Sequence, residues 1–147
     1  MPVISTNKRA YFDYEILETF EAGVVLTGQE VKSIKTGHIS LAGAFVTMKG
    51  SEAWLTNSTV PPYKMAGKIF GYEQSRPRKL LLHKKELSSL IGKIKQKGLT
   101  LVPLRVYTKG SKVKLEFGIG RGKKKYEKRE AIKKREVDRK IRSAMLQ

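Results

Sequence analysis

The amino-acid sequence predicts a mainly β protein with flanking α-helices, closed into a small antiparallel barrel and followed by a basic C-terminal arm. Much of the region before residue 120 alternates apolar and polar side chains, which is the period of strands with one buried face. Only two stretches there have helical spacing, and glycine-containing turns join successive alternations as hairpins. Six or seven short strands connected in this way are typical of a curled antiparallel barrel.

The strongest alternation covers residues 112–119, where apolar side chains share one face. They are Val113, Leu115, Phe117 and Ile119. Residues 99–107 predict the preceding strand, and Lys109-Gly110-Ser111 supplies the hairpin turn between them. Pro103 interrupts this strand, and because proline has no amide hydrogen we expect a bulge or a sheet edge there.

Two further hairpins are predicted earlier in the chain. Residues 44–48 and 53–57 form one, with its turn at Lys49-Gly50-Ser51. Residues 14–20 and 24–26 form the other, with its turn at Glu21-Ala22-Gly23. Residues 80–82 predict a short buried strand. Residues 60–78, which include three prolines and have weak periodicity, predict a loop across the barrel mouth.

The two helices are predicted from apolar spacing and from their ends. The longer one covers residues 84–97 and ends at Gly98, with apolar side chains at i, i+3, i+4 and i+7. These are Leu87, Leu90, Ile91 and Ile94. Thr27 and Glu30 have the spacing of a capping box, so a short helix is expected to begin there and to end at Gly37.

Charge divides the chain into two parts. The sequence contains 31 Lys and Arg residues and 13 Asp and Glu residues, which gives a net charge of +18. Residues 121–147 hold 12 of the basic and 4 of the acidic residues, so a basic arm follows a barrel domain of residues 1–120. A small soluble domain usually carries a net charge of roughly 2 to 8. The excess predicts a polyanionic partner, with nucleic acid first and an anionic membrane surface second.

The arm has the composition of a highly charged helix. It contains no Gly or Pro from Tyr126 onward, and its acidic residues precede basic ones by four positions, as in Glu136 and Lys140. Its apolar stripe is narrow and consists of Val137, Ile141, Ala144 and Met145. Such a stripe binds a core weakly, so we expect the arm to be disordered when free and helical on a phosphate-lined surface. The alternative is a permanently solvated helix packed on the barrel.

Several classes of site are disfavoured by the residues present. The chain has no cysteine, and its two histidines, His38 and His83, have no cluster of carboxylates near them in sequence, so neither a disulfide nor a metal site is expected. Residues 118–124 are rich in Gly and Lys but lack the spacing of a phosphate-binding loop, and we interpret them as a flexible joint. No cofactor is expected.

A catalytic site is also not indicated. No nucleophile, base and orienting group can be assembled, and Glu21 and Glu30 are explained equally well as a turn acid and a capping acid. The residues therefore favour a binding module over an enzyme. No signal peptide or long apolar segment is present, so a cytoplasmic protein is expected.

Two groups of residues are candidate contacts with RNA. Tyr11, Phe12 and Tyr14 follow directly after Asn7-Lys8-Arg9, and aromatic rings beside cations suit base stacking with phosphate contact, although strand aromatics are more often buried in a core. The cluster Arg76-Pro77-Arg78-Lys79, together with Lys84 and Lys85, is expected to extend one positive face.

Short motifs throughout the chain narrow these possibilities. They are Asn7-Lys8-Arg9-Ala10, Phe20-Glu21-Ala22-Gly23, Gly28-Gln29-Glu30-Val31-Lys32-Ser33, Arg78-Lys79-Leu80-Leu81-Leu82 and Gly122-Lys123-Lys124, followed by Tyr126-Glu127-Lys128-Arg129. In this order and spacing the chain resembles the SmpB family, the SsrA-binding proteins of bacterial trans-translation. The resemblance extends from Asn7 to the C-terminus.

The resemblance implies an OB-like closed barrel that binds the tRNA-like domain of transfer-messenger RNA. It also implies a tail that is unstructured until it enters the empty mRNA channel of a stalled ribosome, where it becomes helical at the decoding centre. The resemblance further implies that elongation factor Tu with GTP accompanies delivery, and we expect the protein to act as a monomer without catalysis.

The resemblance also implies roles for particular residues. Those expected to bind RNA are Asn7, Lys8, Arg9, Tyr14, Glu21, Lys32, Leu81, His83 and Lys114. Those expected to act in the tail are Gly122, Lys123 and Lys124, which orient it, and Tyr126, Glu127, Lys128, Arg129 and Met145, which act at the decoding centre. Leu81 is expected to hold its strand in place. Glu21 is expected to accept from base or sugar donors or to orient a neighbouring cation.

Three positions differ from the pattern of the family. Glu127 stands where Asp is usual, Tyr126 where His is frequent, and His83 where some members carry Asn. The first keeps the charge, the second keeps a ring, and the third keeps hydrogen-bonding capacity.

From the residues alone, other functions remain open. A structural ribosomal protein or a generic basic RNA-binding protein would have the same charge distribution. An RNA-processing enzyme has no feature in its favour. Membrane binding ranks last, because the apolar stripe of the arm lacks the large apolar residues that such helices carry.

Overall fold

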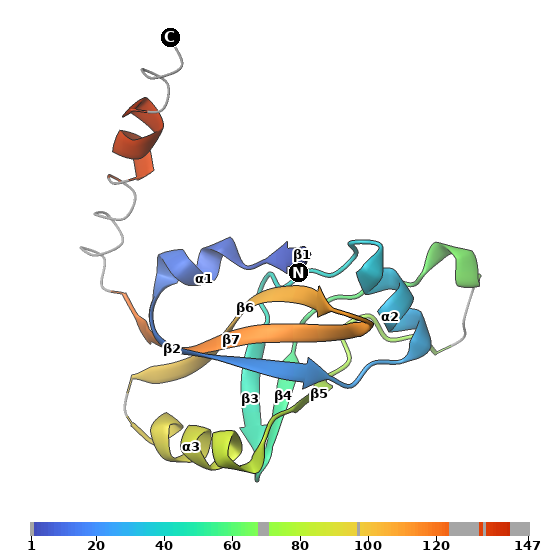
Figure 1. Ribbon diagram of the computed structural model, residues 1–147, viewed down its shortest axis with the longest axis horizontal. Coiled ribbons are helices and arrows are strands. Elements are labelled where there is room, and N and C mark those ends of the chain that lie inside the picture. Colours follow the sequence, from blue (N-terminus) through green and yellow to red (C-terminus); the bar gives the residue numbers. More distant parts are fainter. Residues whose placement is uncertain (1, 68–70, 97, 124–132, 134, 142–147) are drawn as a thin grey trace.

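The fold is a strongly curved antiparallel sheet with helices at its margins (Figure 1). The computed structural model describes residues 2–67, 71–96, 98–123, 133 and 135–141. Within them one sheet has the strand order β1-β6-β7-β2-β5-β4-β3, and neighbouring strands are antiparallel. The elements in chain order are β1 (Val3–Thr6), α1 (Lys8–Asp13), β2 (Tyr14–Val24), α2 (Gly28–Lys35), β3 (Phe45–Lys49), β4 (Glu52–Thr56), the 3-10 helix η1 (Lys64–Ala66), β5 (Arg78–Leu81), α3 (Lys84–Ile94), β6 (Leu99–Lys109) and β7 (Lys112–Gly122).

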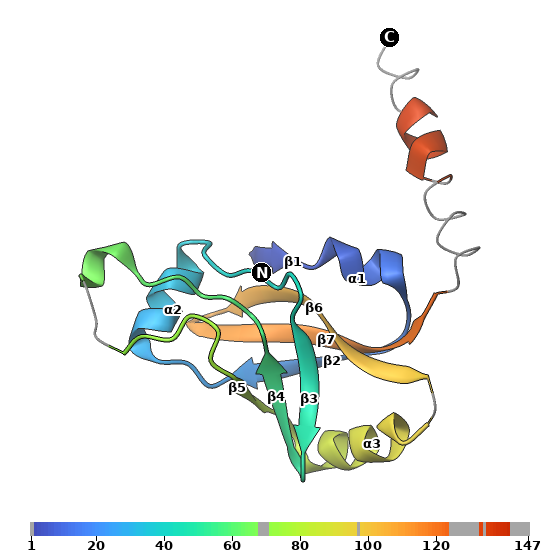
Figure 2. The same ribbon diagram turned by 180° about the vertical axis from the view of Figure 1, so that it is seen from behind.

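The sheet bends so that its two halves cross. Figures 1 and 2 show β3 and β4 running across the long strands β2, β6 and β7, and β3 contacts β6. The mainly β class with flanking helices is therefore confirmed. Closure of the barrel is not confirmed, because β1 and β3 are the edge strands and no hydrogen-bonded ladder joins them in the described part of the chain.

The core lies inside this bend and follows the alternation predicted for residues 112–119. All four predicted side chains of β7 are buried, and the Phe117 ring stacks on that of Phe20 with centroids 5.6 Å apart. The predicted irregularity at Pro103 is confirmed by a register shift between Pro103 and Arg105. The predicted hairpin turn between β6 and β7 is also confirmed, with Gly110 at a φ of 63° that favours glycine.

The two predicted helices are confirmed. The Thr27 hydroxyl accepts from the Glu30 amide, and the Glu30 carboxylate accepts from the Thr27 amide, which is the predicted capping box. The other helix, α3, ends at Ile94, earlier than residue 97, and buries Leu90 completely. The short elements β1, α1 and η1 were not predicted, because segments of three to six residues are too short to show a hydrophobic period.

The hairpin predicted for residues 14–26 is wrong. Glu21, Ala22 and Gly23 do not turn. They continue β2 and pair with β7, Ala22 standing opposite Leu115 with both side chains buried. The small residues suggested a turn, but they leave room for the neighbouring strands. A Cβ added to Gly23 would lie 3.4 Å from the Cβ of Leu81.

The positive face predicted for residues 76–79 is also wrong in part. Arg78 is fully buried, and its Nε donates to Oε2 of Glu30 at 2.7 Å. Arg76 Nε donates to the same oxygen at 3.1 Å, and Arg78 Nη1 donates to the Ser58 carbonyl at 3.2 Å. These contacts, which we call the Glu30 network, fasten the loop after β4 to α2. Arg76 and Arg78 therefore stabilise the folded structure.

Glu30 remains ionised within this network. Burial raises the pKa of its carboxyl, but hydrogen bonds from Arg76 and from the Thr27 amide and the charge of Arg78 outweigh burial. The net pKa lies below the ordinary value. The folded protein therefore favours the charged form of the carboxylate, and the network contributes most to stability while Glu30 is ionised.

The described part of the arm is helical and stands away from the sheet (Figures 1 and 2). Val137 and Ile141, from the predicted apolar stripe, are about half exposed. The Arg135 guanidinium lies 5.4 Å from the centroid of the Phe12 ring in α1. The domain boundary at residue 120, disorder of the free arm and its folding on a ribosome stay predictions. In the described residues no helix has the length and apolar character to cross a membrane.

Candidate nucleic-acid interface

A groove of about 740 Å³ lies between the end of β2, the start of β7, the β5–α3 junction and α2. Four of the residues expected to bind RNA line it, and these are Glu21, Leu81, His83 and Lys114. Lys112 and Glu86 also line it. We call this the Glu21 groove.

Strand register brings these four residues together from distant parts of the sequence. Gly23 pairs with Lys114 on one side and with Leu81 on the other. His83 precedes the first residue of α3, where its amide donates to Oε1 of Glu86 at 3.3 Å. Leu81 lies in β5, as expected, but the strand is buried on one face only, so Leu80 is 2% exposed and Leu81 is 55% exposed. An exposed leucine at the groove is available for contact with a partner.

Glu21 is an acidic residue of the groove that lies near basic side chains. Its Oε2 accepts a hydrogen bond from the Tyr107 hydroxyl, and its Oε1 lies 3.6 Å from Lys109 Nζ. The hydrogen bond from Tyr107 has the largest influence on the pKa of Glu21 and lowers it. Burial opposes this effect, but the charges of Lys109 and Lys114 add to the lowering, so the pKa lies below its ordinary value. The contact with Lys109 is compatible with one of the two roles expected for Glu21, orientation of a neighbouring cation, and both roles stay predictions.

Tyr107 is a residue of this site that the sequence analysis missed. Its side chain is only 4% exposed, and the Arg105 guanidinium lies 5.6 Å from its ring centroid. Arg105 is fixed in turn by Glu116, whose Oε2 accepts from Nε at 3.2 Å and from Nη2 at 2.8 Å. Burial, followed by the hydrogen bond to Glu21, raises the pKa of Tyr107, so the hydroxyl keeps its proton and donates. The sequence predicts that Tyr107 lies on a strand, but the contact with Glu21 depends on how the strands are arranged in the sheet and cannot be predicted from the sequence.

A second group of expected RNA-binding residues lies around α1, beside another groove of about 760 Å³. Asn7, Lys8, Arg9 and Tyr14 belong to it. Asn7 fastens α1 to β6, since its Nδ2 donates to the Pro103 carbonyl at 2.9 Å and its amide to that of Leu104 at 2.7 Å. We call the groove of about 760 Å³ the α1 groove.

The cations of the α1 groove differ in their contacts. Arg9 lies 5.2 Å from the centroid of the Phe12 ring and pairs with Asp13 at 3.0 Å. Lys8 is exposed at the start of α1. Tyr14 packs beside Gly120, where an added Cβ would approach the tyrosine Cβ to 3.0 Å. Tyr14 therefore has a packing role in addition to any contact with RNA.

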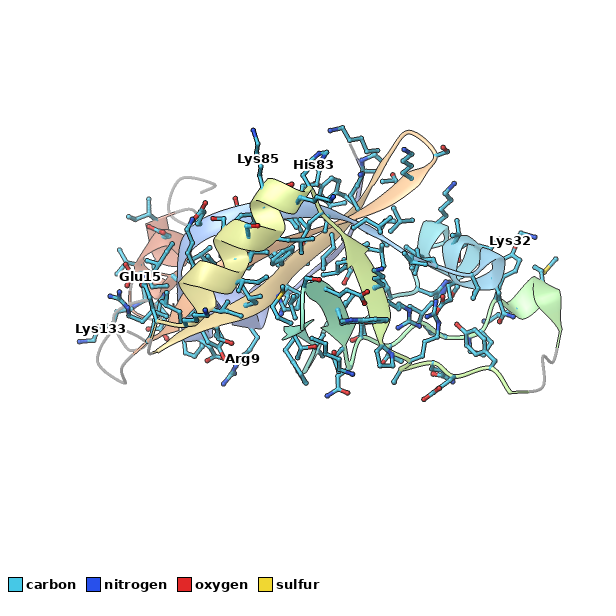
Figure 3. All side chains as sticks on the ribbon, turned by 90° about the horizontal axis from the view of Figure 1, so that it is seen from below. Arg9, Glu15, Lys32, His83, Lys85 and Lys133 are labelled. Atoms are coloured by element: carbon cyan, nitrogen blue, oxygen red, sulfur yellow. The ribbon has the colours of Figure 1, made fainter. Side chains whose placement is uncertain are left out.

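The nine expected RNA-binding residues do not form one surface. Figure 3 shows His83 and Lys85 on one side of the molecule, Arg9 on the opposite side and Lys32 at the far end on α2. Lys32 Nζ lies 6.0 Å from the ring centroid of Tyr63, just before η1. The structure thus divides the expected site between two faces and one end.

The arm leaves the body beside α1. The Lys123 amide donates to the Asp13 carbonyl at 2.8 Å, and its Nζ donates to the Tyr11 carbonyl at 3.1 Å. Both carbonyls lie in the last turn of α1, where the partial negative charge of the helix end stabilises the Lys123 ammonium group. Gly122 directly precedes this attachment at the end of β7. The other expected tail residues lie outside the described residues, and these are Lys124, Tyr126, Glu127, Lys128, Arg129 and Met145.

Comparison with known proteins identifies relatives over nearly the whole chain. The family model described as SmpB protein matches residues 4–147. The SsrA-binding protein of Sulfurihydrogenibium sp. (strain YO3AOP1) is 55% identical over 139 residues, which cover 95% of this chain and 91% of the relative. The SsrA-binding protein of Roseiflexus castenholzii (strain DSM 13941 / HLO8) is 50% identical over 143 residues, which cover 97% of this chain and 90% of the relative.

A solved structure agrees with these matches. A chain from the work described as "tmRNA-SmpB: a journey to the center of the bacterial ribosome" superimposes with a TM-score of 0.69 and 44% identity. The superposition covers 90% of this chain and 95% of that chain. On the full-length family match, the identities and the shared fold, the chain belongs to the SmpB family.

Proposed function

We propose that this protein binds the tRNA-like domain of transfer-messenger RNA and delivers it to stalled ribosomes for trans-translation. The observation that carries the proposal is the match of the SmpB family over residues 4–147, together with relatives named SsrA-binding protein. SmpB is a family of RNA-binding proteins and not of enzymes. The protein acts in the cytoplasm as a monomeric carrier.

The Glu21 groove is the proposed site for the tRNA-like domain. Lys112 and Lys114 line it, and its exposed Leu81 offers an apolar surface for a base or a sugar. Lysines neutralise phosphates and give affinity, while a fixed acceptor such as Glu21 can recognise a particular donor. This combination suits a structured RNA better than a uniform polyanion.

The arm is the proposed ribosome side, and Asn7, Lys8, Arg9 and Tyr14 of the α1 groove are proposed as further contacts with RNA. Lys123 fastens the start of the arm to α1, and Arg9 lies on the side opposite His83. In this proposal Gly122, Lys123 and Lys124 direct the arm into the mRNA channel, and residues 126–129 and Met145 act at the decoding centre. Elongation factor Tu with GTP accompanies the charged RNA. An OB-like closed barrel carries both faces.

The proposal is tested by competitive RNA binding at near-physiological salt. The full chain should prefer transfer-messenger RNA over bulk tRNA, and Lys114→Ala should weaken binding and reduce the dependence of affinity on salt by about one phosphate contact. Lys133→Ala, which removes an exposed lysine of the arm, is the matched control and should leave the affinity nearly unchanged. Equal affinity of the full chain for both RNAs would contradict the proposal.

A further inference from the structure

Glu21 is an unexpected residue in a groove that is proposed to bind RNA phosphates, because phosphate binding requires basic side chains and not acidic ones. An ionised carboxylate repels phosphate and can only accept hydrogen bonds. Glu86 also lines the groove, but its Oε1 accepts from the His83 amide and so caps α3. Glu21 has no such role in capping, and its side chain is 38% exposed. Its presence calls for a different explanation.

The carboxylate of Glu21 is held in place from below. Tyr107 lies beneath the surface, and its hydroxyl donates to Oε2. The tyrosine ring is itself covered by Arg105, which Glu116 fixes through two hydrogen bonds. Four side chains from β2, β6 and β7 thus form a chain of contacts that ends at one exposed carboxylate.

Glu21 lines the groove and keeps acceptor capacity in addition to its contact with Tyr107. One oxygen is engaged by Tyr107, while the other lies 3.6 Å from Lys109 Nζ, beyond hydrogen-bond distance. A phosphate has no proton to donate to this oxygen at neutral pH, whereas a ribose 2′-hydroxyl or a base amino group has one. An RNA bound in the groove must therefore present such a donor at Glu21 and place its phosphates at the lysines.

We propose that Tyr107 is a positioning residue that fixes Glu21 as a specificity-determining acceptor for a hydrogen-bond donor of the bound RNA. The carboxylate sets the register of the RNA, since a phosphate shifted towards it would be repelled and has no proton to donate to it. The inference rests on the proposed function, because it assumes that the RNA occupies the Glu21 groove.

Tyr107→Phe tests the inference, since it removes the hydroxyl and keeps the ring. The probe is tRNA-like-domain RNA with sparse 2′-deoxy substitutions or with bases that lack their amino group, which are inosine for guanosine, purine riboside for adenosine and 2-pyrimidinone riboside for cytidine. The readout is the set of positions at which a substitution weakens binding. For the unmodified protein we expect at least one sensitive position. A 2′-deoxy effect identifies a ribose hydroxyl, and an inosine effect identifies the guanine amino group.

Tyr107→Phe should erase that sensitive position and weaken binding by about tenfold, the loss typical of one hydrogen bond to a charged group. Tyr72→Phe is the matched control, because the Tyr72 hydroxyl donates to the Val60 carbonyl at 2.7 Å away from the groove. It should leave the pattern unchanged. Glu21→Gln keeps the size of the side chain and replaces one acceptor oxygen with an NH2 donor, so it should also erase the position and identify Glu21 as the acceptor that Tyr107 holds.

Two results would overturn the inference. One is a pattern in Tyr107→Phe identical to that of the unmodified protein, whatever the result for Glu21→Gln, and the other is the absence of any sensitive position in the unmodified protein. Failure of the proposed function has a separate signature. In that case the unmodified protein would bind bulk tRNA as tightly as transfer-messenger RNA in the competition experiment.

Discussion

The Glu30 network and the Glu21 groove use the same kinds of residue for opposite purposes. Each contains a glutamate whose pKa is lowered by basic or hydroxyl partners. Glu30 is 1% exposed and has two arginines fixed against it, whereas Glu21 is 38% exposed and has a lysine 3.6 Å away. Burial therefore decides whether the charge serves the fold or a partner. The first network should control stability and the second should control recognition.

The largest effect is expected for Arg78→Met. Removing one partner leaves a buried carboxylate with incomplete compensation, which costs about 3 kcal/mol in the free energy of unfolding. Urea unfolding measures this loss, and RNA affinity of the folded protein should be unchanged. Arg105→Met is the matched control, because the Arg105 side chain is 44% exposed and its pair with Glu116 should contribute about 1 kcal/mol or less. Equal losses in the two variants would contradict the distinction.

A smaller effect is expected from acid. The pKa of Glu30 in the folded protein lies below the ordinary value of 4.5, so its ionised form adds stability above that pH. The contribution is lost as pH falls through the folded pKa. Glu30→Gln should therefore lower stability at neutral pH and flatten the decline of the urea midpoint below about pH 5. Glu52→Gln removes an exposed carboxylate and controls for the change in net charge; a decline as steep in Glu30→Gln as in that control would refute the assignment.

The smallest effect is expected where the arm meets the body. Phe12→Leu removes the ring beneath the Arg9 and Arg135 guanidiniums, and each such contact at an exposed site contributes about 0.5–1 kcal/mol. We expect little change in thermal unfolding but faster reorientation of the arm, measured by anisotropy of a fluorophore at position 141. Phe45→Leu, at an exposed position on β3, is the control. Identical anisotropy in both variants would show that the Phe12 contact does not restrain the arm.

The parts of the fold that were predicted correctly depend on neighbours in sequence. The alternation in β7, the capping box at Thr27 and the bulge at Pro103 each arise from residues within a few positions of one another. The wrong turn at residues 21–23 has the opposite cause. Small residues there satisfy a turn locally, and only pairing with β7 makes them part of a strand.

The same reasoning explains which site residues were found. Glu21, Leu81, His83 and Lys114 were identified through family resemblance, and the structure brings them to one groove. Tyr107 carried no local signal, because its importance depends on cross-strand contact with Glu21. For Arg78 the local sequence signal was misleading. A run of basic residues usually indicates a solvated surface, and nothing nearby in sequence shows that Glu30 lies against it.

The central claim is that the curved sheet domain recognises the RNA and the arm acts on the ribosome. The most direct test measures transfer-messenger RNA affinity and nascent-chain tagging for the full chain and for a chain truncated after Lys123, which keeps β7 and its attachment to α1. The account predicts selective RNA binding by both and tagging by the full chain alone. Loss of selective RNA binding on truncation, or tagging that persists without the arm, would contradict it.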